Sequence, residues 1–468
     1  MPYFGHVPPA RLGEEPGTIG GVAMNLQTIA RLSIIACFLF PAAAVAADFA
    51  VDTATLSNGM VVAVISDHRA PIVTQLVYYR AGAADENDSN RGIAHMLEHM
   101  MFQGTLTVPG EEYRNTIARF GGRENAFTSA DTTGYWQTVG KEALKVVMRL
   151  ESDRMQNLVI EEAAFLSEVE VVKEERRQRY ETSPGGPFGE AVDAAAYLAH
   201  PYRYPTIGYM HNIEAFTIDE AREWYDKWYA PANAILVIAG DVTLAEVLPL
   251  AEQYYGAIPA GEKQPWNRAV EPPQLAERRV IFRDERVRQP SFGRSYLAPA
   301  RTARDGLAPA LTVAAEILNG STGPLYQSLV VEQGVAASAG AYYGGNSRDW
   351  GRFGVWMAPN RESDIAVMEV AMDELLAKIL ETGVSRDDVA LAQHSISASM
   401  IYARDSVSRL ARRVGGGLVV GLTVEEITGW STEVDAVTVE DVNGALRQIL
   451  DRRQSVTGIM LPADGKAL

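Results

Sequence analysis

The sequence predicts an α+β protein of two homologous halves, each a mainly antiparallel sheet with helices packed on it. Strand-like and helical segments stay segregated along the chain, which favours α+β over a parallel α/β sheet. Both halves run strands, helices, strand, helices and strand over a similar length, which indicates an internal duplication. The 468 residues are too many for one ordinary core and enough for two domains of about 200 residues.

Local patterns predict the elements of the first half. Alternating apolar residues predict strands at 60–65 and 72–79. An apolar helix is expected to begin near Gly92 and to end at Gly104, because glycine tolerates a positive φ. The remaining elements are two paired strands at 125–128 and 133–139, helices at 141–157 and 161–181, and a buried strand at 234–241.

Residues 258–276, rich in Pro, Glu, Gln and Ala, are interpreted as the linker between the halves. After it we expect a strand at 279–283, helices at 306–318 and 363–382, and a final strand at 455–460. The chain should therefore divide into three parts, an N-terminal extension with signal peptide (1–47), an N-terminal domain (48–262) and a homologous C-terminal domain (263–468).

The N-terminal extension carries the pattern of a secretory signal. Arg31 supplies positive charge, residues 32–40 form an apolar run too short to span a bilayer, and Ala-Val-Ala at 44–46 is a cleavage signal. Met24 is then the predicted start of translation, and the protein is predicted to be exported to the periplasm. The alternative is a lipid anchor through Cys37, which cleavage after Ala46 would remove.

The net charge of −17 argues against a nucleic-acid partner, whose phosphates require Lys and Arg. An acidic surface suits cationic substrates, but solubility is its commoner explanation. No stretch after the signal is long and apolar enough for a membrane helix. A mature chain without cysteine would have to hold any metal through His and carboxylates.

The main functional motif is H-x-x-E-H at His95, Glu98 and His99. On a helix these three side chains share one face, and two imidazoles four residues apart can bind one Zn²⁺. Glu98 is placed to act as general base toward a water at the metal. A lone histidine would be read as structural, but two histidines and a glutamate in this pattern, among 7 histidines, favour the metal.

A catalytic zinc site needs a third protein ligand. The predicted helix at 161–181 offers Glu168, Glu174 and Glu175. Glu168 and Glu175 are seven residues apart and share a face, whereas Glu174 points about 100° away from Glu175. A ligand with a supporting carboxylate suits the first pair. The alternative is a solvated charged face. Of the remaining histidines, His200, His211 and His394 are interpreted as turn or surface residues, and His68 has no matching ligand partner.

The pattern resembles the inverted-zincin family of pitrilysin, insulin-degrading enzyme and mitochondrial processing peptidase. The resemblance covers nearly the whole mature chain. It is carried by residues 92–102 around the motif, by Gly121-Gly122 with Asn125, Ala126 and Thr128, by 168–175, by His200-Pro201-Tyr202, and by Trp228-Tyr229 with Gly240-Asp241.

The resemblance implies the two-half processing-peptidase (LuxS-like metallohydrolase) fold, with one zinc in the first half and no metal site in the second. His95, His99 and Glu175 would be the zinc ligands, Glu98 the general base and Glu168 the supporting carboxylate. A peptide substrate would add as a strand to the edge that contains the four residues Asn125, Ala126, Phe127 and Thr128.

The second half departs from the family pattern. Active relatives carry an Arg and a Tyr, seven residues apart, that hold the substrate and stabilise charge on the scissile carbonyl oxygen. Here Val330 and Ala337 stand at those positions, and Tyr342 and Tyr343 are out of register. We therefore expect a zinc endopeptidase that is the zinc-bearing subunit of a heterodimer, with a homologous partner that lacks the zinc motif and supplies Arg and Tyr. The alternatives are a non-catalytic structural or chaperone-like subunit and, less favoured by this length, a small-molecule hydrolase or lyase.

Overall fold

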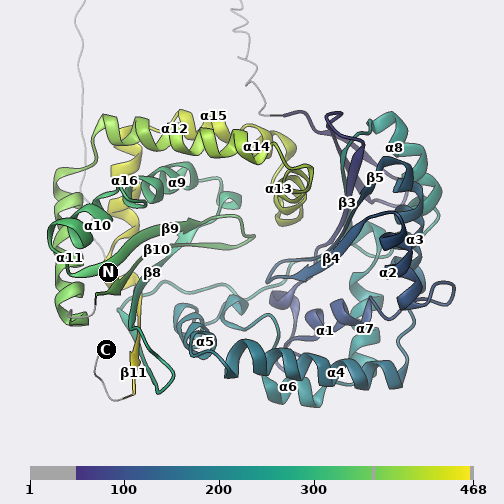
Figure 1. The fold of residues 1–468 in the computed structure, drawn as a ribbon, viewed down its shortest axis with the longest axis horizontal. Coiled ribbons are helices and arrows are strands. Elements are labelled where there is room, and N and C mark those ends of the chain that lie inside the picture. Colours follow the sequence, from purple (N-terminus) through teal and green to yellow (C-terminus); the bar gives the residue numbers. More distant parts are fainter. Residues whose placement is uncertain (1–48, 361–363, 464–468) are drawn as a thin grey trace, which may run out of the picture. The chain divides into compact units, whose positions relative to one another are not determined.

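Two mixed sheets form the framework of the fold (Figure 1). The computed structural model describes residues 49–360 and 364–463, so the predicted export signal lies outside the described residues. The first sheet has the strand order β1-β2-β6-β3-β5-β4. Its strands are β1 (Asp52–Thr55), β2 (Val61–Ser66), β3 (Ile72–Tyr79), β4 (Arg123–Thr128), β5 (Thr133–Gly140) and β6 (Ala234–Gly240).

The second sheet repeats the topology of the first. Its strand order is β7-β11-β8-β10-β9. Each sheet has one parallel pair, β2 with β6 in the first and β7 with β11 in the second. The other neighbouring strands in both sheets are antiparallel. The predicted α+β class and the two related halves are therefore confirmed. The strands are β7 (Arg278–Asp284), β8 (Ser291–Pro299), β9 (Ala336–Gly344), β10 (Trp350–Pro359) and β11 (Ser455–Pro462).

Helices cover both faces of the first sheet. One face forms the largest apolar core with helices from its own half. The other face packs against α13 (Val407–Val420), which comes from the second half and lies beside β3 and β6 (Figure 1). The helices of the first half are α1 (Ile93–Met100), α2 (Gly110–Arg119), α3 (Leu144–Asn157), α4 (Glu162–Arg176), α5 (Gly185–Ala196), α6 (Met210–Ala215), α7 (Ile218–Trp228) and α8 (Leu244–Ala251).

The second sheet receives a helix from the first half in return. α5 packs on β7, β8 and β11, where Phe188 and Val192 contact Gly458. The opposite face forms a separate apolar core with helices that lie between its strands in the chain. The other helices of this half are α9 (Leu307–Leu318), α10 (Pro324–Tyr326), α11 (Ile365–Thr382), α12 (Arg386–Ala403), α14 (Val424–Thr428), α15 (Trp430–Asp435) and α16 (Val439–Ile449).

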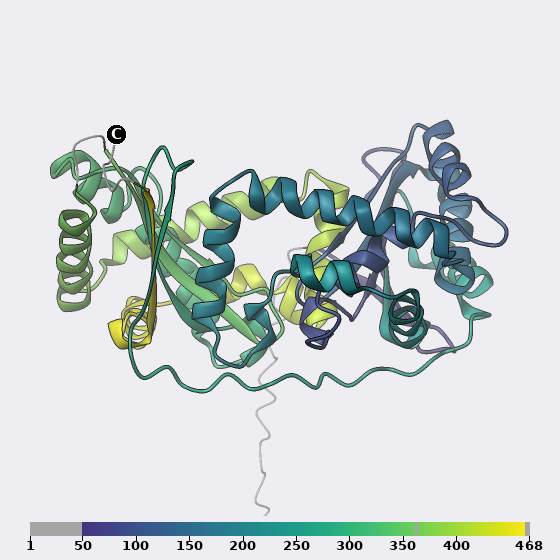
Figure 2. The same cartoon turned by 90° about the horizontal axis from the view of Figure 1, so that it is seen from below.

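The predicted elements are present, with shifted ends. The helix that bears the motif ends at Met100 rather than at Gly104, whose positive φ of 111° belongs to the following turn. The predicted helix at 161–181 is α4 continued by a π-helical turn, Arg177–Glu181. Residues 258–276 contain neither helix nor strand, and Figure 2 shows an extended trace there. The domain boundary at 262/263 stays a prediction. Among the described helices, none has the length and apolar character needed to cross a bilayer.

Candidate metal centre

Helix α1 is fixed at its N-terminus by a buried carboxylate. The two oxygens of Glu86 accept hydrogen bonds from the backbone N–H groups of Gly92 (2.8 Å) and Ala94 (2.9 Å). Gly92 has φ 99°, and a Cβ there would lie 2.3 Å from the carbonyl oxygen of Ile207. Only glycine fits this start of the helix without strain. The buried Ile93, Met96, Leu97 and Met100 then hold α1 in the core.

The structure brings His95, His99 and Glu175 together, each offering a ligand atom within 4.8 Å of the others. Oε2 of Glu175 lies 3.6 Å from Nε2 of His95 and 3.3 Å from Nε2 of His99. Its Oε1 lies 2.5 Å from a guanidinium nitrogen of Arg179, one turn further along the chain. The carboxylate is therefore oriented with one oxygen toward the two imidazoles.

These atoms suit a zinc ion. Two imidazole nitrogens and one carboxylate oxygen form a donor set typical of catalytic zinc sites. Zinc–ligand bonds of about 2.0 Å at tetrahedral angles separate the donor atoms by about 3.3 Å. The distances from Glu175 to the two histidines match this separation. The three residues could therefore hold one zinc ion and leave a position open.

Glu168 supports the second histidine. Its Oε2 lies 3.1 Å from Nδ1 of His99, and its Oε1 accepts a hydrogen bond from Nε2 of Gln103 at 2.7 Å. A carboxylate on the other ring nitrogen fixes the tautomer and orientation of a metal-binding imidazole. Glu174 points away and lies beside Arg177. Glu168 and Glu175 therefore both reach His99, and their roles at a metal stay a prediction.

The two imidazoles differ in their electrostatic surroundings. Burial, with repulsion from His99, lowers the pKa of His95 to about 4, so its ring is neutral at pH 7. Burial also acts to lower the pKa of His99, but Glu168 and Glu175 outweigh it and raise that pKa to about 9. Positive charge is therefore favoured between His99 and the two carboxylates. A metal cation would displace that proton on binding.

Glu98 lies on α1 between the two histidines and is oriented by the next element. Its Oε2 accepts a hydrogen bond of 2.6 Å from Oγ1 of Thr128, at the end of β4. Burial raises the pKa of Glu98, and the Thr128 hydrogen bond works in the opposite direction. A carboxylate with a raised pKa is a better proton acceptor. The sequence pattern placed Thr128 on the edge strand but gave no sign of this contact.

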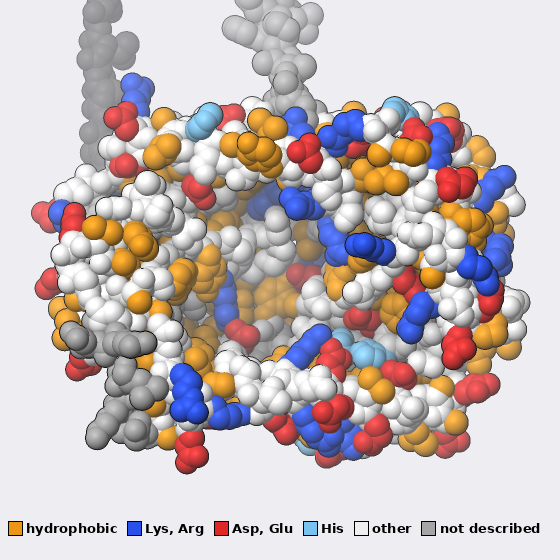
Figure 3. All heavy atoms as spheres, viewed as in Figure 1, with side chains coloured by type: hydrophobic (Ala, Val, Ile, Leu, Met, Phe, Trp, Pro, Cys, Tyr) orange, Lys and Arg blue, Asp and Glu red, His pale blue; other side chains and the backbone are white. Residues whose placement is uncertain are grey.

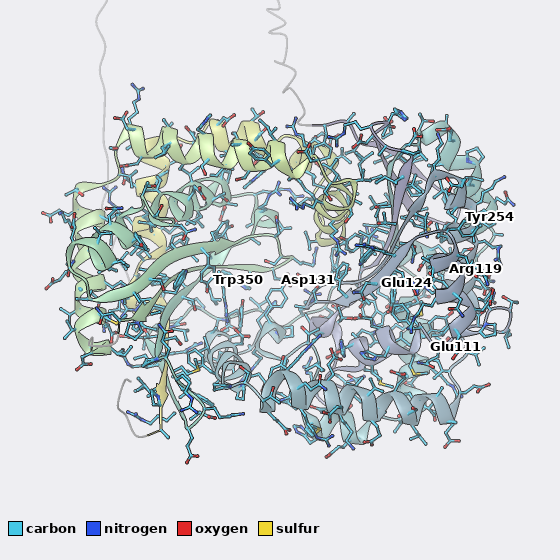
Figure 4. All side chains as sticks on the ribbon, viewed as in Figure 1. Glu111, Arg119, Glu124, Asp131, Tyr254 and Trp350 are labelled. Atoms are coloured by element: carbon cyan, nitrogen blue, oxygen red, sulfur yellow. The ribbon has the colours of Figure 1, made fainter. Side chains whose placement is uncertain are left out.

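Strand β4 is the edge of the first sheet, next to β5. Its outer backbone groups have no neighbouring strand among the described residues. Side chains alternate along it, so Ala126 and Thr128 share the face of α1, and Asn125 and Phe127 the opposite face. Figure 4 labels Glu124 on this strand and Asp131 in the turn that follows it. An extended peptide could pair with this edge.

Sequence reasoning missed a buried ionic network beside this turn. Arg268, in the linker, donates to Asp85 (two contacts of 3.0 Å), Asp131 (2.5 Å) and Asp349 (2.9 Å). His200 was expected in a turn or at the surface; it does begin a turn but is buried, 3.2 Å from Asp349. An isolated arginine in a polar linker carries no pattern that marks it as buried.

His68, His211 and His394 are not part of the metal-ligand cluster found among the described residues. His68 is exposed and pairs with Asp241 at 2.6 Å, His211 stacks on Tyr209, and His394 is exposed. In the second half, Val330 lies in the π-helical turn Gln327–Glu332 and packs against the apolar core there. Ala337 is exposed on β9.

Comparison with known proteins gives the family. Residues 61–209 match the family described as Insulinase (Peptidase family M16), and residues 215–396 match the Peptidase M16 inactive domain. The zinc protease PqqE of Helicobacter pylori is 26% identical over 414 residues, which cover 88% of this chain and 93% of that protein. The mitochondrial-processing peptidase subunit beta of Blastocladiella emersonii is 25% identical over 419 residues, 86% and 87% of the two chains.

Solved structures agree with these matches. The crystal structure of a protease from Helicobacter pylori superposes with a TM-score of 0.81 at 26% identity, over 88% of this chain and all of that one. The peptidase M16 inactive domain from Pseudomonas fluorescens has a TM-score of 0.79 at 16% identity, over 88% and 98%, and shows the fold alone. The chain belongs to peptidase family M16, the family of pitrilysin and mitochondrial processing peptidase.

Proposed function

We propose that this chain is a zinc-dependent endopeptidase that hydrolyses peptides or unfolded segments. The observation that carries the proposal is the joint placement of Glu98 with His95, His99 and Glu175. A structural subunit has no need of a half-buried carboxylate on the same helix as two imidazoles that meet a third carboxylate. Relatives named as zinc proteases support the choice of metal and of reaction.

The residues of the site divide the work of hydrolysis. His95, His99 and Glu175 would hold the zinc, which when bound polarises the scissile carbonyl and makes water more acidic. Glu98 takes the proton from the attacking water and returns it to the leaving amine. Thr128 keeps Glu98 in position through its 2.6 Å hydrogen bond. Strand β4 holds the substrate backbone extended beside the site, so affinity depends little on sequence.

The second part of the proposal is a heterodimer. With Val330 and Ala337 at the family's Arg and Tyr positions, this chain has no donor there for the carbonyl oxygen. Loss of such a donor costs about 100–1,000-fold in turnover. We infer that a homologous partner without the zinc motif supplies both groups. A relative described as a processing-peptidase subunit beta supports this arrangement. The signal pattern at 24–46 supports a periplasmic location.

The test combines metal analysis with peptide hydrolysis. The full mature chain is expected to bind one zinc, and the chain mixed with its partner to cleave unstructured peptides at least about 100-fold faster than alone. Glu98→Gln should keep the zinc and lose turnover. Full activity of the chain alone would refute the heterodimer. Absence of stoichiometric zinc would refute the enzyme and favour the alternative, a non-catalytic subunit.

A further inference from the structure

An unpaired arginine lies on the far face of the edge strand. Arg412, on α13, places its guanidinium carbon 5.3 Å from the ring centre of Phe127 on β4 and 5.2 Å from that of Trp136 on β5. Among the described residues, no carboxylate lies within ion-pair distance of Arg412. Stacking on a ring leaves the N–H donors at the rim of the guanidinium free to bind an acceptor.

Arg412 also lines a cavity of about 610 Å³. The cavity extends from α13 to β9, α9, α12 and α15, and its charged lining residues are Arg301, Arg412, Arg413 and Glu316. Glu316 accepts a hydrogen bond from Ser395, and Arg301 donates to the carbonyl oxygen of Glu426. The cavity is therefore cationic in a protein whose net charge is −17. Figure 3 shows basic side chains around a hollow beside α13.

Register on β4 decides what would meet Arg412. A peptide paired with this edge lies about 4.8 Å away, with its side chains alternately on the two sheet faces. Side chains on the face of Thr128 and Glu98 approach the metal centre. Those on the face of Phe127 lie beside Arg412. Every second substrate residue is thus presented to the cationic cavity and not to the metal.

We propose that Arg412 and this cavity form a subsite that selects an acidic side chain, Asp or Glu, of a peptide bound along β4. The inference rests on the proposed peptidase function and names its substrate class. The substrate carboxylate would accept hydrogen bonds from the N–H groups of Arg412, and the guanidinium would keep its contact with the ring of Phe127. Selection at one position on the Phe127 face is compatible with broad tolerance elsewhere, because main-chain pairing provides the rest of the affinity.

The test measures binding, so that it does not depend on turnover. A zinc-loaded Glu98→Gln full chain is titrated with fluorescent ten-residue peptides in which a single Glu, or its neutral isostere Gln, occupies each position in turn. At one position we expect the peptide with Glu to bind about tenfold more tightly than the peptide with Gln, which is the contribution of one charge-assisted hydrogen bond. The preference for Glu should be smaller at the positions two residues away.

Variants of α13 assign the preference to the arginine. Adding Arg412→Gln should reduce the Glu-to-Gln ratio to about one, and Arg412→Lys should restore part of it, since the charge returns without the planar group. Arg409→Gln, an exposed arginine one turn away, is the matched control and should keep the full ratio. Thermal unfolding of each variant separates loss of the preference from loss of the fold.

The outcomes are distinguishable. If peptides bind but Glu and Gln are equivalent at every position, or if the preference survives Arg412→Gln, the subsite is refuted and the peptidase is not. If no peptide binds, the proposed function fails as well. If inorganic phosphate displaces the acidic peptide at a lower concentration than the peptide needs to bind, the cavity is a general anion site, and the substrate assignment is overturned.

Discussion

Replacing Arg268 by methionine should destabilise the fold severely. Arg268 is 4% exposed and pairs with Asp85 (3% exposed) and Asp131 (10% exposed). Met fills most of the volume but leaves both carboxylates buried without their cation. Breaking a buried pair from one side costs about 3–5 kcal/mol. The free energy of unfolding, from urea titration followed by circular dichroism, is expected to fall by that amount at neutral pH.

The pH dependence gives the sign of the effect. Burial raises the pKa of Asp85, and Arg268 partly offsets that rise. In the Arg268→Met variant the pKa of Asp85 rises further. A protonated Asp85 carries no buried charge, so the variant loses stability as the pH rises through the pKa of Asp85 in the folded state. The deficit of the variant should therefore be smaller at about pH 5 than at about pH 8.

Two controls make this result decisive. Asp85→Asn added to Arg268→Met should recover part of the lost stability, because it removes one stranded charge. Arg119→Met removes an arginine that is 61% exposed, pairs with the exposed Glu112 and donates to Thr116, so the free energy of unfolding should fall by less than about 1 kcal/mol. A deficit below about 1 kcal/mol for Arg268→Met, or one independent of pH, would refute the reasoning.

Three further predictions concern the site and its helix. Glu168→Gln should weaken zinc binding about 10–100-fold in a competition with a chelator, and an unchanged affinity would contradict its supporting role. Thr128→Val should move the acid limb of kcat/KM to higher pH, because the hydrogen bond that lowers the pKa of Glu98 is lost; an unshifted limb would remove Thr128 from the mechanism. Gly92→Ala should destabilise by more than about 1 kcal/mol in thermal unfolding, whereas Gly189→Ala, in a helix with open space around it, should not; equal effects would contradict the strain argument.

Most of the fold, and the side chains that meet at the candidate site, could be predicted because they follow from short-range periodicity. His95, Glu98 and His99 share a helix face by spacing alone, and the same rule separates Glu175 from Glu174. What spacing cannot supply is the distance between helices. That Glu175 reaches both imidazoles depends on how α4 packs beside α1, which is a property of the whole core.

The contacts that the sequence could not reveal join segments far apart in the chain. Glu86 binds backbone N–H groups at the start of α1. Every helix offers such groups, so the sequence does not show that Glu86 makes this contact. Arg268 meets Asp85 and Asp131 across more than 130 positions, 183 and 137 respectively. The position of a single charge in a linker is set by tertiary packing. No local pattern records it.

One sequence signal did contain long-range information. The run at 234–239, Ala-Ile-Leu-Val-Ile-Ala, is apolar without alternation, which is typical of a strand buried on both faces. In the structure β6 is buried throughout, with the first-half core on one face and α13 on the other. Gly415 lets α13 approach, since a Cβ there would lie 2.0 Å from the ring of Tyr78.

That contact gives the second half a role that does not require a metal. By covering the first sheet opposite α1, α13 completes the burial of β3 and β6. The same helix carries Arg412 to the Phe127 face of the edge strand β4. If peptides bind along the edge strand as proposed, a half with no zinc motif, and with Val330 and Ala337 in place of Arg and Tyr, still shapes which side chains are bound. In the heterodimer proposed above, this chain would select substrate through α13 and would obtain its carbonyl donors from the partner.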